Sequence, residues 1–194
     1  FGCPIEDSAE GEISFGDFPA VDRGREVTGI RLRFAGGRVV EASADTNEPY
    51  LIETLDTDEG ARRLGELGIG CNPGITRYMK NTLFDEKMDG TVHLALGNSY
   101  TDLGGVNQSA IHWDLVKDLR PPGSRIELDG NVVAGVGQLD PEPLRQAVER
   151  VREEEDAHQQ IRGSCSPASQ STMRRPPKLV SICTKWCGSA IASP

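Results

Sequence analysis

The sequence predicts an α+β fold, in which a mostly antiparallel, curved sheet or partial barrel is flanked by helices. Three observations favour it: period-two alternation in several short stretches, Gly-containing turns that suit hairpins, and helical spacing of apolar residues concentrated between 48 and 83. Strands that are grouped, instead of alternating strictly with helices, argue against a parallel doubly wound sheet. A chain of 194 residues is long enough to bury one sizeable core.

The strand predictions rest on alternation and on turn residues. Residues 27–34 place Ile30 and Leu32 on one face and Arg31 on the other, the pattern of a half-buried strand. An Ala-Gly-Gly turn then leads into a returning strand over 38–44, which predicts a hairpin. Three further strand-like stretches, each bounded by Gly or Pro, follow at 91–96, 110–117 and 124–133.

Helices are predicted from apolar spacing and from capping residues. Residues 48–67 carry that spacing with a break at 56–60, which predicts two helices, the second capped by the acidic run 56–59. A short helix is expected over 73–83. A further helix is expected over 141–156, where a thin apolar stripe among Arg and Glu favours a solvated surface helix and leaves a partner-binding helix open.

Charge and composition exclude some classes of function. The net charge is −9, whereas residues 163–194 hold four Lys or Arg and no acid, which predicts a disordered or non-native tail. The rest of the chain is acidic, which argues against a nucleic-acid partner. No apolar run approaches ~18 residues, so no membrane-spanning helix is expected.

The five cysteines and the first residues bear on cellular context. An odd, scattered set favours a reducing, cytoplasmic compartment over a disulfide framework. Cys183 and Cys187 lack the second pair that a zinc ribbon needs. Because the chain opens on Phe1 with no initiating Met and no apolar leader, we expect a fragment of a longer protein.

The middle third gathers residue types that bind metals. His112 and Asp114 stand two apart in a strand, so they share a face and form half of a divalent metal site. A core histidine satisfied by a neighbouring carboxylate is the alternative. Glu66 lies in a Gly-rich apolar segment, and Glu86 precedes the strand that carries His93. With few basic residues between them, these groups suit Zn²⁺, Co²⁺ or Mn²⁺, ions often bound in pairs ~3.5–4 Å apart.

Several motifs resemble the thermophilic aminopeptidase family of metallopeptidases, the aminopeptidase T and aminopeptidase S type. They are LGELGIGCNPGI, NTLFDEKMDGTVHLALGNSY, NQSAIHWDLVKDLR and ELDGNVV, with EDSAEGEI and GREVTGIRLRF before them. The resemblance implies hydrolysis of the N-terminal peptide bond of peptides with a free N-terminus. It also implies a water activated by two divalent ions and, for the full-length family protein, a homodimer.

The resemblance carries over residue by residue. It implies Glu66 as a metal ligand that also acts as base, Glu86 as an acid close to the metals, His93 as a ligand, Tyr100 as the active-site tyrosine, and His112 with Asp114 as the closing ligand pair. A further family glutamate would fall immediately before Phe1, and the family's N-terminal domain would precede it. The chain is therefore expected to hold the C-terminal catalytic domain over 1–136, truncated at its N-terminal edge, a surface helix over 137–162, and the tail.

Two alternatives remain open at this point. One is a catalytically inactive fragment that still binds metal. The other is an acidic interaction module in which the histidines and Asp114 are structural. For Tyr100, a hydroxyl that only closes a turn is the alternative to a role in catalysis.

Overall fold

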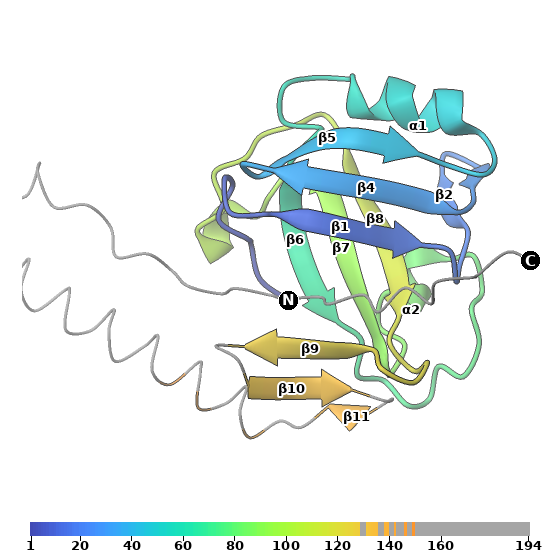
Figure 1. Ribbon diagram of the computed structural model, residues 1–194, viewed down its shortest axis with the longest axis vertical. Coiled ribbons are helices and arrows are strands. Elements are labelled where there is room, and N and C mark those ends of the chain that lie inside the picture. The colour runs from blue at the N-terminus through green and yellow to red at the C-terminus, as the bar shows by residue number, and fades with distance from the viewer. Residues whose placement is uncertain (129–130, 136–137, 140–141, 143–145, 147–148, 150–194) are drawn as a thin grey trace, which may run out of the picture.

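A computed structural model describes residues 1–128, 131–135, 138–139, 142, 146 and 149. The predicted boundary at 136–137, the tail over 163–194 and all but those last three residues of the predicted 141–156 helix lie outside the described part. Within it, the strands pair antiparallel in each sheet and are joined by few helices (Figure 1). The predicted α+β class, with unclosed sheets, is confirmed.

The first sheet has the order β1-β4-β5, with β1 at Gly11–Phe15, β4 at Ile30–Ala35 and β5 at Arg38–Ser43. The predicted hairpin is therefore present. Apolar residues of β4 such as Leu32 are buried, whereas Arg31 points outward to Asp45. The predicted strand over 27–34 is nevertheless interrupted, because Thr28 bonds with Thr46. Its beginning belongs to β3 (Arg25–Val27), which pairs with β2 (Ala20–Asp22) in a small ribbon.

The second sheet has the order β6-β7-β8, with β6 at Leu64–Ile69, β7 at Thr91–Gly97 and β8 at His112–Asp118. The strands predicted over 91–96 and 110–117 are thus found. The second helix predicted after 56–59 is wrong, because β6 occupies that part of the chain. Gly65 and Gly68 weaken a helix there, and pairing with β7 supplies the backbone hydrogen bonds that a helix would have made.

Two α-helices lie within residues 1–128. The first, α1 at Glu48–Leu55, agrees with the sequence prediction, whereas the helix predicted over 73–83 is reduced to α2 at Thr82–Asp85. The buried Asp85 carboxylate accepts the backbone N–H groups of Met79 and Asn81, which holds the preceding loop out of a helix. No described helix has the length and apolar character needed to cross a membrane.

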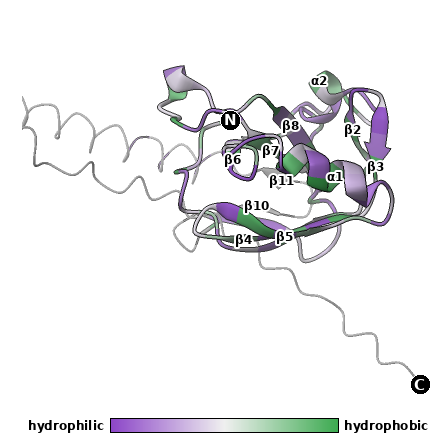
Figure 2. Cartoon of the chain, turned by 90° about the horizontal axis from the view of Figure 1, so that it is seen from above, coloured by the Kyte–Doolittle hydropathy of each residue, from purple (hydrophilic) through white to green (hydrophobic). Residues whose placement is uncertain are grey.

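The core lies between the two larger sheets, whose strands cross steeply (Figure 1). Seen from above, α1 lies across the space between them (Figure 2), and its Leu51 and Leu55 are fully buried. The first sheet contributes side chains such as Leu32 and Phe34, and the second contributes side chains such as Leu96 and Leu115. Burial of these apolar groups is the main force that holds the sheets face to face.

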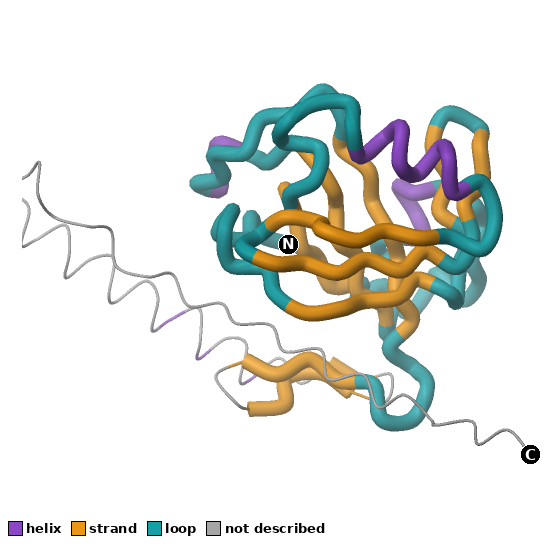
Figure 3. The backbone as a smooth tube through the Cα atoms, turned by 45° about the horizontal axis from the view of Figure 1, so that its top comes forward, coloured by secondary structure: helices purple, strands orange, loops and turns teal. Residues whose placement is uncertain are grey.

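A third small sheet is built from β9 (Arg125–Leu128), β10 (Asn131–Gly135) and β11 (Gln138–Leu139). The single strand predicted over 124–133 is therefore two strands that pair antiparallel. This sheet lies below β1 in the orientations of Figures 1 and 3. It contributes none of the candidate site residues.

Candidate metal centre

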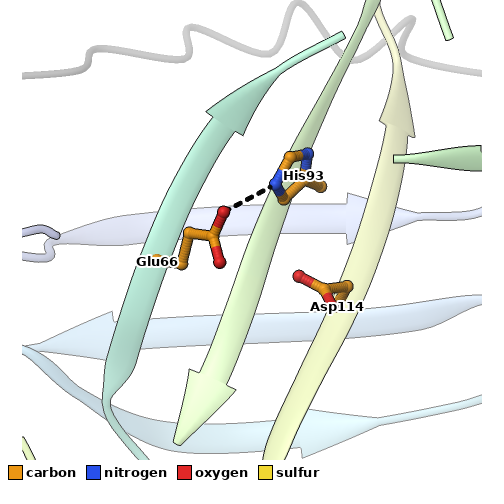
Figure 4. A group of neighbouring side chains, drawn as sticks. All are labelled: Glu66, His93 and Asp114. Atoms are coloured by element: carbon orange, nitrogen blue, oxygen red, sulfur yellow. Dashed lines mark hydrogen bonds and ion pairs between the residues drawn. The ribbon is translucent and has the colours of Figure 1, made fainter. Parts of the chain in front are cut away.

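The candidate site lies on the face of the β6-β7-β8 sheet that is turned away from the core. Because side chains alternate along a strand, the core receives Leu94 and Trp113, whereas Glu66, His93 and Asp114 point to the other face (Figure 4). Loops and neighbouring segments cover this face so well that the side chains of Glu66, His93 and Asp114 are only 7%, 6% and 10% exposed.

Strand register brings the polar groups together across three strands. Ala95 on the central strand pairs with Glu66 on one side and with Asp114 on the other. Its small side chain leaves the two carboxylates free to approach each other over the middle of the sheet. His93 stands two residues back along β7, on the same face, opposite Gly68.

Glu66 lies between the two imidazoles. Its Oε1 is 3.1 Å from His93 Nε2, and its Oε2 is 3.2 Å from His112 Nε2. His112 Nε2 is also 3.8 Å from Asp114 Oδ1. Glu66, His93 and Asp114 each offer a ligand atom, and these atoms lie within 4.8 Å of one another. Such a set of carboxylate oxygens and imidazole nitrogens suits a divalent cation.

Main-chain carbonyls orient both imidazoles. His93 Nδ1 lies 3.0 Å from the Glu86 carbonyl oxygen, and His112 Nδ1 lies 2.8 Å from the Asn98 carbonyl oxygen. A carbonyl can only accept, so each Nδ1 donates its hydrogen and each Nε2 is turned to Glu66. Two neutral rings would then aim lone pairs at a carboxylate. A cation among these atoms removes that repulsion.

Asp114 provides an independent test of fit. Its Oδ1 and the Trp113 Nε1 are the buried side-chain polar atoms that lack a hydrogen-bond partner within the described residues. Burial raises the pKa of Asp114, and the charges of Glu86 and Glu66 raise it further, although His112 and His93 act against them. An orphaned carboxylate oxygen at the middle of a donor cluster fits a metal ligand, because burying it without a partner is otherwise costly.

Glu86 and Tyr100 lie at the edge of this cluster. The Glu86 carboxylate is paired with Lys87, whereas the Glu86 main-chain carbonyl accepts a hydrogen bond from His93 Nδ1. The Tyr100 ring meets the His112 ring edge-on at a centroid distance of 5.3 Å. Burial raises the pKa of Tyr100, and the carboxylates of Glu66, Asp114 and Glu86 act in the same direction.

Two expectations about the site can be compared with the geometry. Glu66 was expected at the end of a helix before Gly68, which is wrong, because it stands within β6. His112 and Asp114 do share a face of one strand, with His93 on the neighbouring strand, as expected. Sequence reasoning missed Asn98 and Ala95. One acts through its main chain and the other by being small, so neither carries a chemical signature in the sequence.

The start of the chain borders the same cluster. Gly2 exchanges both backbone hydrogen bonds with Leu67 of β6, at 2.9 Å each. The Phe1 ring lies against Tyr100, with 5.7 Å between ring centroids. The further glutamate that the resemblance implies before Phe1 stays a prediction.

Comparisons with known proteins agree with this geometry. Residues 1–132 match the sequence model of the thermophilic metalloprotease (M29) family. Aminopeptidase T of Thermus aquaticus is 35% identical over 132 residues, which are 59% of this chain and 31% of that protein. Aminopeptidase 2 of Geobacillus stearothermophilus is 34% identical over 134 residues, 60% of this chain and 32% of that protein. The chain thus spans about a third of the length of these curated relatives.

Solved structures extend the likeness to three dimensions. The wild-type AmpT of Thermus thermophilus has a TM-score of 0.53 and 36% identity, and the match covers 58% of this chain and 31% of that one. A 2,5-dihydroxypyridine dioxygenase of Pseudomonas putida KT2440 has a TM-score of 0.56 at 20% identity, over 71% of this chain and 42% of that one, and shows the fold alone. Since the family match covers well over half of its residues, the chain belongs to the thermophilic metalloprotease (M29) family.

Proposed function

We propose that this chain is the metal-binding part of a metal-dependent aminopeptidase, which hydrolyses the first peptide bond of peptides with a free N-terminus. The observation that carries the proposal is the convergence of Glu66, His93, His112 and Asp114 on one face of the β6-β7-β8 sheet, where one Asp114 oxygen has no hydrogen-bond partner. Relatives named as aminopeptidases support the reaction class.

The proposed ligands are Glu66, Glu86, His93, His112 and Asp114, and the proposed cofactor is a pair of Zn²⁺, Co²⁺ or Mn²⁺ ions. Divalent ions held there would supply Lewis acidity and lower the pKa of a water molecule. The remaining chemistry falls to the protein's own groups. Main-chain carbonyls hold both imidazoles in the ligating tautomer, so little reorganisation is needed when a cation enters.

Glu66 is the proposed proton carrier. Its carboxylate is buried at the centre of the cluster, where it would accept the proton of the attacking water and pass it to the leaving amine. Tyr100 is the proposed donor to the oxyanion that develops on the scissile carbonyl. A donor must be protonated, which a tyrosine hydroxyl already is at neutral pH, and the raised pKa of Tyr100 acts in the same direction. The acidic groups would also attract the substrate's α-ammonium.

The test combines metal content with turnover. The 194-residue chain is stripped with a chelator and reloaded with Zn²⁺, Co²⁺ or Mn²⁺, and metal content and hydrolysis of an amino-acid anilide are measured. We expect metal-dependent turnover, and a loss of about 10²–10⁴-fold in Glu66→Gln. Glu53→Gln, which changes an exposed acid of α1, is the control and retains activity.

Other outcomes would redirect the assignment. Metal binding without turnover in any loaded form would indicate a binding fragment that is catalytically inactive. A chain that binds no divalent ion would contradict the proposal and favour an interaction module with structural histidines.

A further inference from the structure

Two glycines, Gly65 and Gly68, stand on either side of Glu66 in β6. One is in close contact with the ring of a site histidine, and the other with a carbonyl group that binds the second histidine. A Cβ atom at Gly68 would lie 2.1 Å from Cε1 and 2.3 Å from Nε2 of His93. At Gly65 it would lie 2.1 Å from the Asn98 carbonyl oxygen. Real Cβ atoms essentially never come within 3.0 Å of such neighbours, so any side chain at either position would displace something.

Space, and not backbone conformation, requires glycine at these two positions. Neither Gly65 nor Gly68 is among the glycines with a positive φ angle. An alanine could therefore adopt both backbone conformations, and its cost would come from the contact alone.

Each glycine acts on a different histidine. Gly68 lies against the His93 ring itself. Gly65 lies against the Asn98 carbonyl oxygen, which accepts the Nδ1 hydrogen of His112 at 2.8 Å. The β6 strand shifts its register between Leu64 and Glu66, and this irregularity brings Gly65 up to the connection between β7 and β8.

We propose that Gly65 and Gly68 are positioning residues of the metal site, Gly68 setting the His93 ring and Gly65 setting His112 through the Asn98 carbonyl. The inference rests on the proposed function only in that both histidines are metal ligands. Neither glycine has a side chain that could bind a metal ion or a substrate. Both act by allowing β6 to pack against the groups that aim the two Nε2 atoms at Glu66.

The test follows the two imidazoles separately in the metal-free 194-residue chain, by spectra that correlate ring protons with ¹⁵N nuclei. In Gly68→Ala we expect the His93 ring signals to shift while those of His112 stay in place. Gly65→Ala has the reverse pattern. Changes that misplace metal ligands cost about 10–100-fold in affinity, so titration with Zn²⁺ alone should show a dissociation constant raised by at least about tenfold in each variant.

Gly37→Ala is the matched control. A Cβ there would lie 1.9 Å from the Glu6 carbonyl oxygen, and its φ of +76° is unfavourable for alanine. This variant in the β4–β5 turn loses stability while both imidazoles and the Zn²⁺ affinity remain as in the parent. If the two site variants shift both imidazoles alike, or if Gly37→Ala shifts them as much, the inference is wrong.

A second measurement serves if Gly68→Ala folds poorly. Removing the ring in His93→Ala removes the atoms that the new Cβ meets, so adding Gly68→Ala to that background should cost little further stability. The double variant should then melt close to His93→Ala alone. An equal drop in melting temperature in both backgrounds would overturn the inference. Because these measurements need no peptide turnover, failure of the peptidase proposal would leave this result standing, and the reverse also holds.

Discussion

Asp58 is a partly buried acid and Asp114 is a largely buried one, and the two carboxylates have contrasting surroundings. In the turn after α1, the Asp58 carboxylate accepts hydrogen bonds from Ala110 N, Ser109 Oγ and Ala61 N. The bond from Ala110 is the main cause that lowers the pKa of Asp58. Asp114 has one oxygen without a hydrogen-bond partner, and burial raises the pKa of its carboxyl group.

The contrast distinguishes an acid whose hydrogen bonds join two segments of the fold from an acid that we propose as a metal ligand. Where Asp58 joins the turn to the segment before β8, the protein supplies every donor itself. At Asp114 one carboxylate oxygen receives no hydrogen bond, and Glu66, His93 and His112 surround the carboxylate. Buried polar groups that lack hydrogen-bond partners in a native protein commonly belong to functional sites.

The largest expected effect is on metal affinity. Asp114→Asn should raise the Zn²⁺ dissociation constant by about a hundredfold, because an amide would replace the proposed anionic ligand. Isothermal titration of the metal-free chain measures it. Asp118→Asn changes an acid of the same strand that is paired with Arg120, and it should alter the constant by less than about threefold. Equal effects of the two changes would remove Asp114 from the ligand set.

The next effect is on stability. Asp58→Asn should lower the free energy of unfolding by about 2 kcal/mol, since hydrogen bonds to a charged acceptor are lost. Urea denaturation measures it. Asp56→Asn is the control, because Asp56 pairs with Arg62 while 58% exposed, and its loss should cost at most about 0.5 kcal/mol. An equal loss of unfolding free energy at both positions would show that the hydrogen bonds of Asp58 contribute no more than an exposed ion pair.

A smaller effect of opposite sign is expected for Asp114 without metal. In the presence of a chelator, Asp114→Asn should raise the free energy of unfolding by about 1 kcal/mol, because it removes a buried charge that lacks a full set of hydrogen-bond partners. The same urea measurement gives the value. A destabilised variant would mean that the carboxylate already stabilises the metal-free fold.

The smallest effect is a pH dependence at Asp58. Because the folded pKa lies below the usual value of 3.8, the unfolded chain binds the proton first as pH falls. The stabilisation by Asp58 is complete above about pH 5 and is lost as the pH drops through the folded value. The stability gap between the parent and Asp58→Asn should thus be constant from pH 7 to 5 and narrow by pH 3. If the difference in stability widened on acidification, the pKa of Asp58 would be raised in the folded state and not lowered.

Much of the second sheet could be predicted from local pattern. The Gly- and Pro-bounded stretches 91–96 and 110–117 predict strands whichever partner they find, and two residues spaced as His112 and Asp114 must then share a face. The segment 64–69 was predicted wrongly, because its apolar residues fit a helix as well as a strand. Only pairing with β7 distinguished the two.

The sequence by itself determined the strand periodicity, the β4–β5 hairpin and the residue types able to bind a metal, because these depend on neighbours close along the chain. The tertiary structure decided that Glu66 lies between two imidazoles, that carbonyls of Glu86 and Asn98 orient them, and that an oxygen of Asp114 has no hydrogen-bond partner. Those properties depend on burial and on segments distant in sequence, which β pairing and the packing of the loops between the strands bring together.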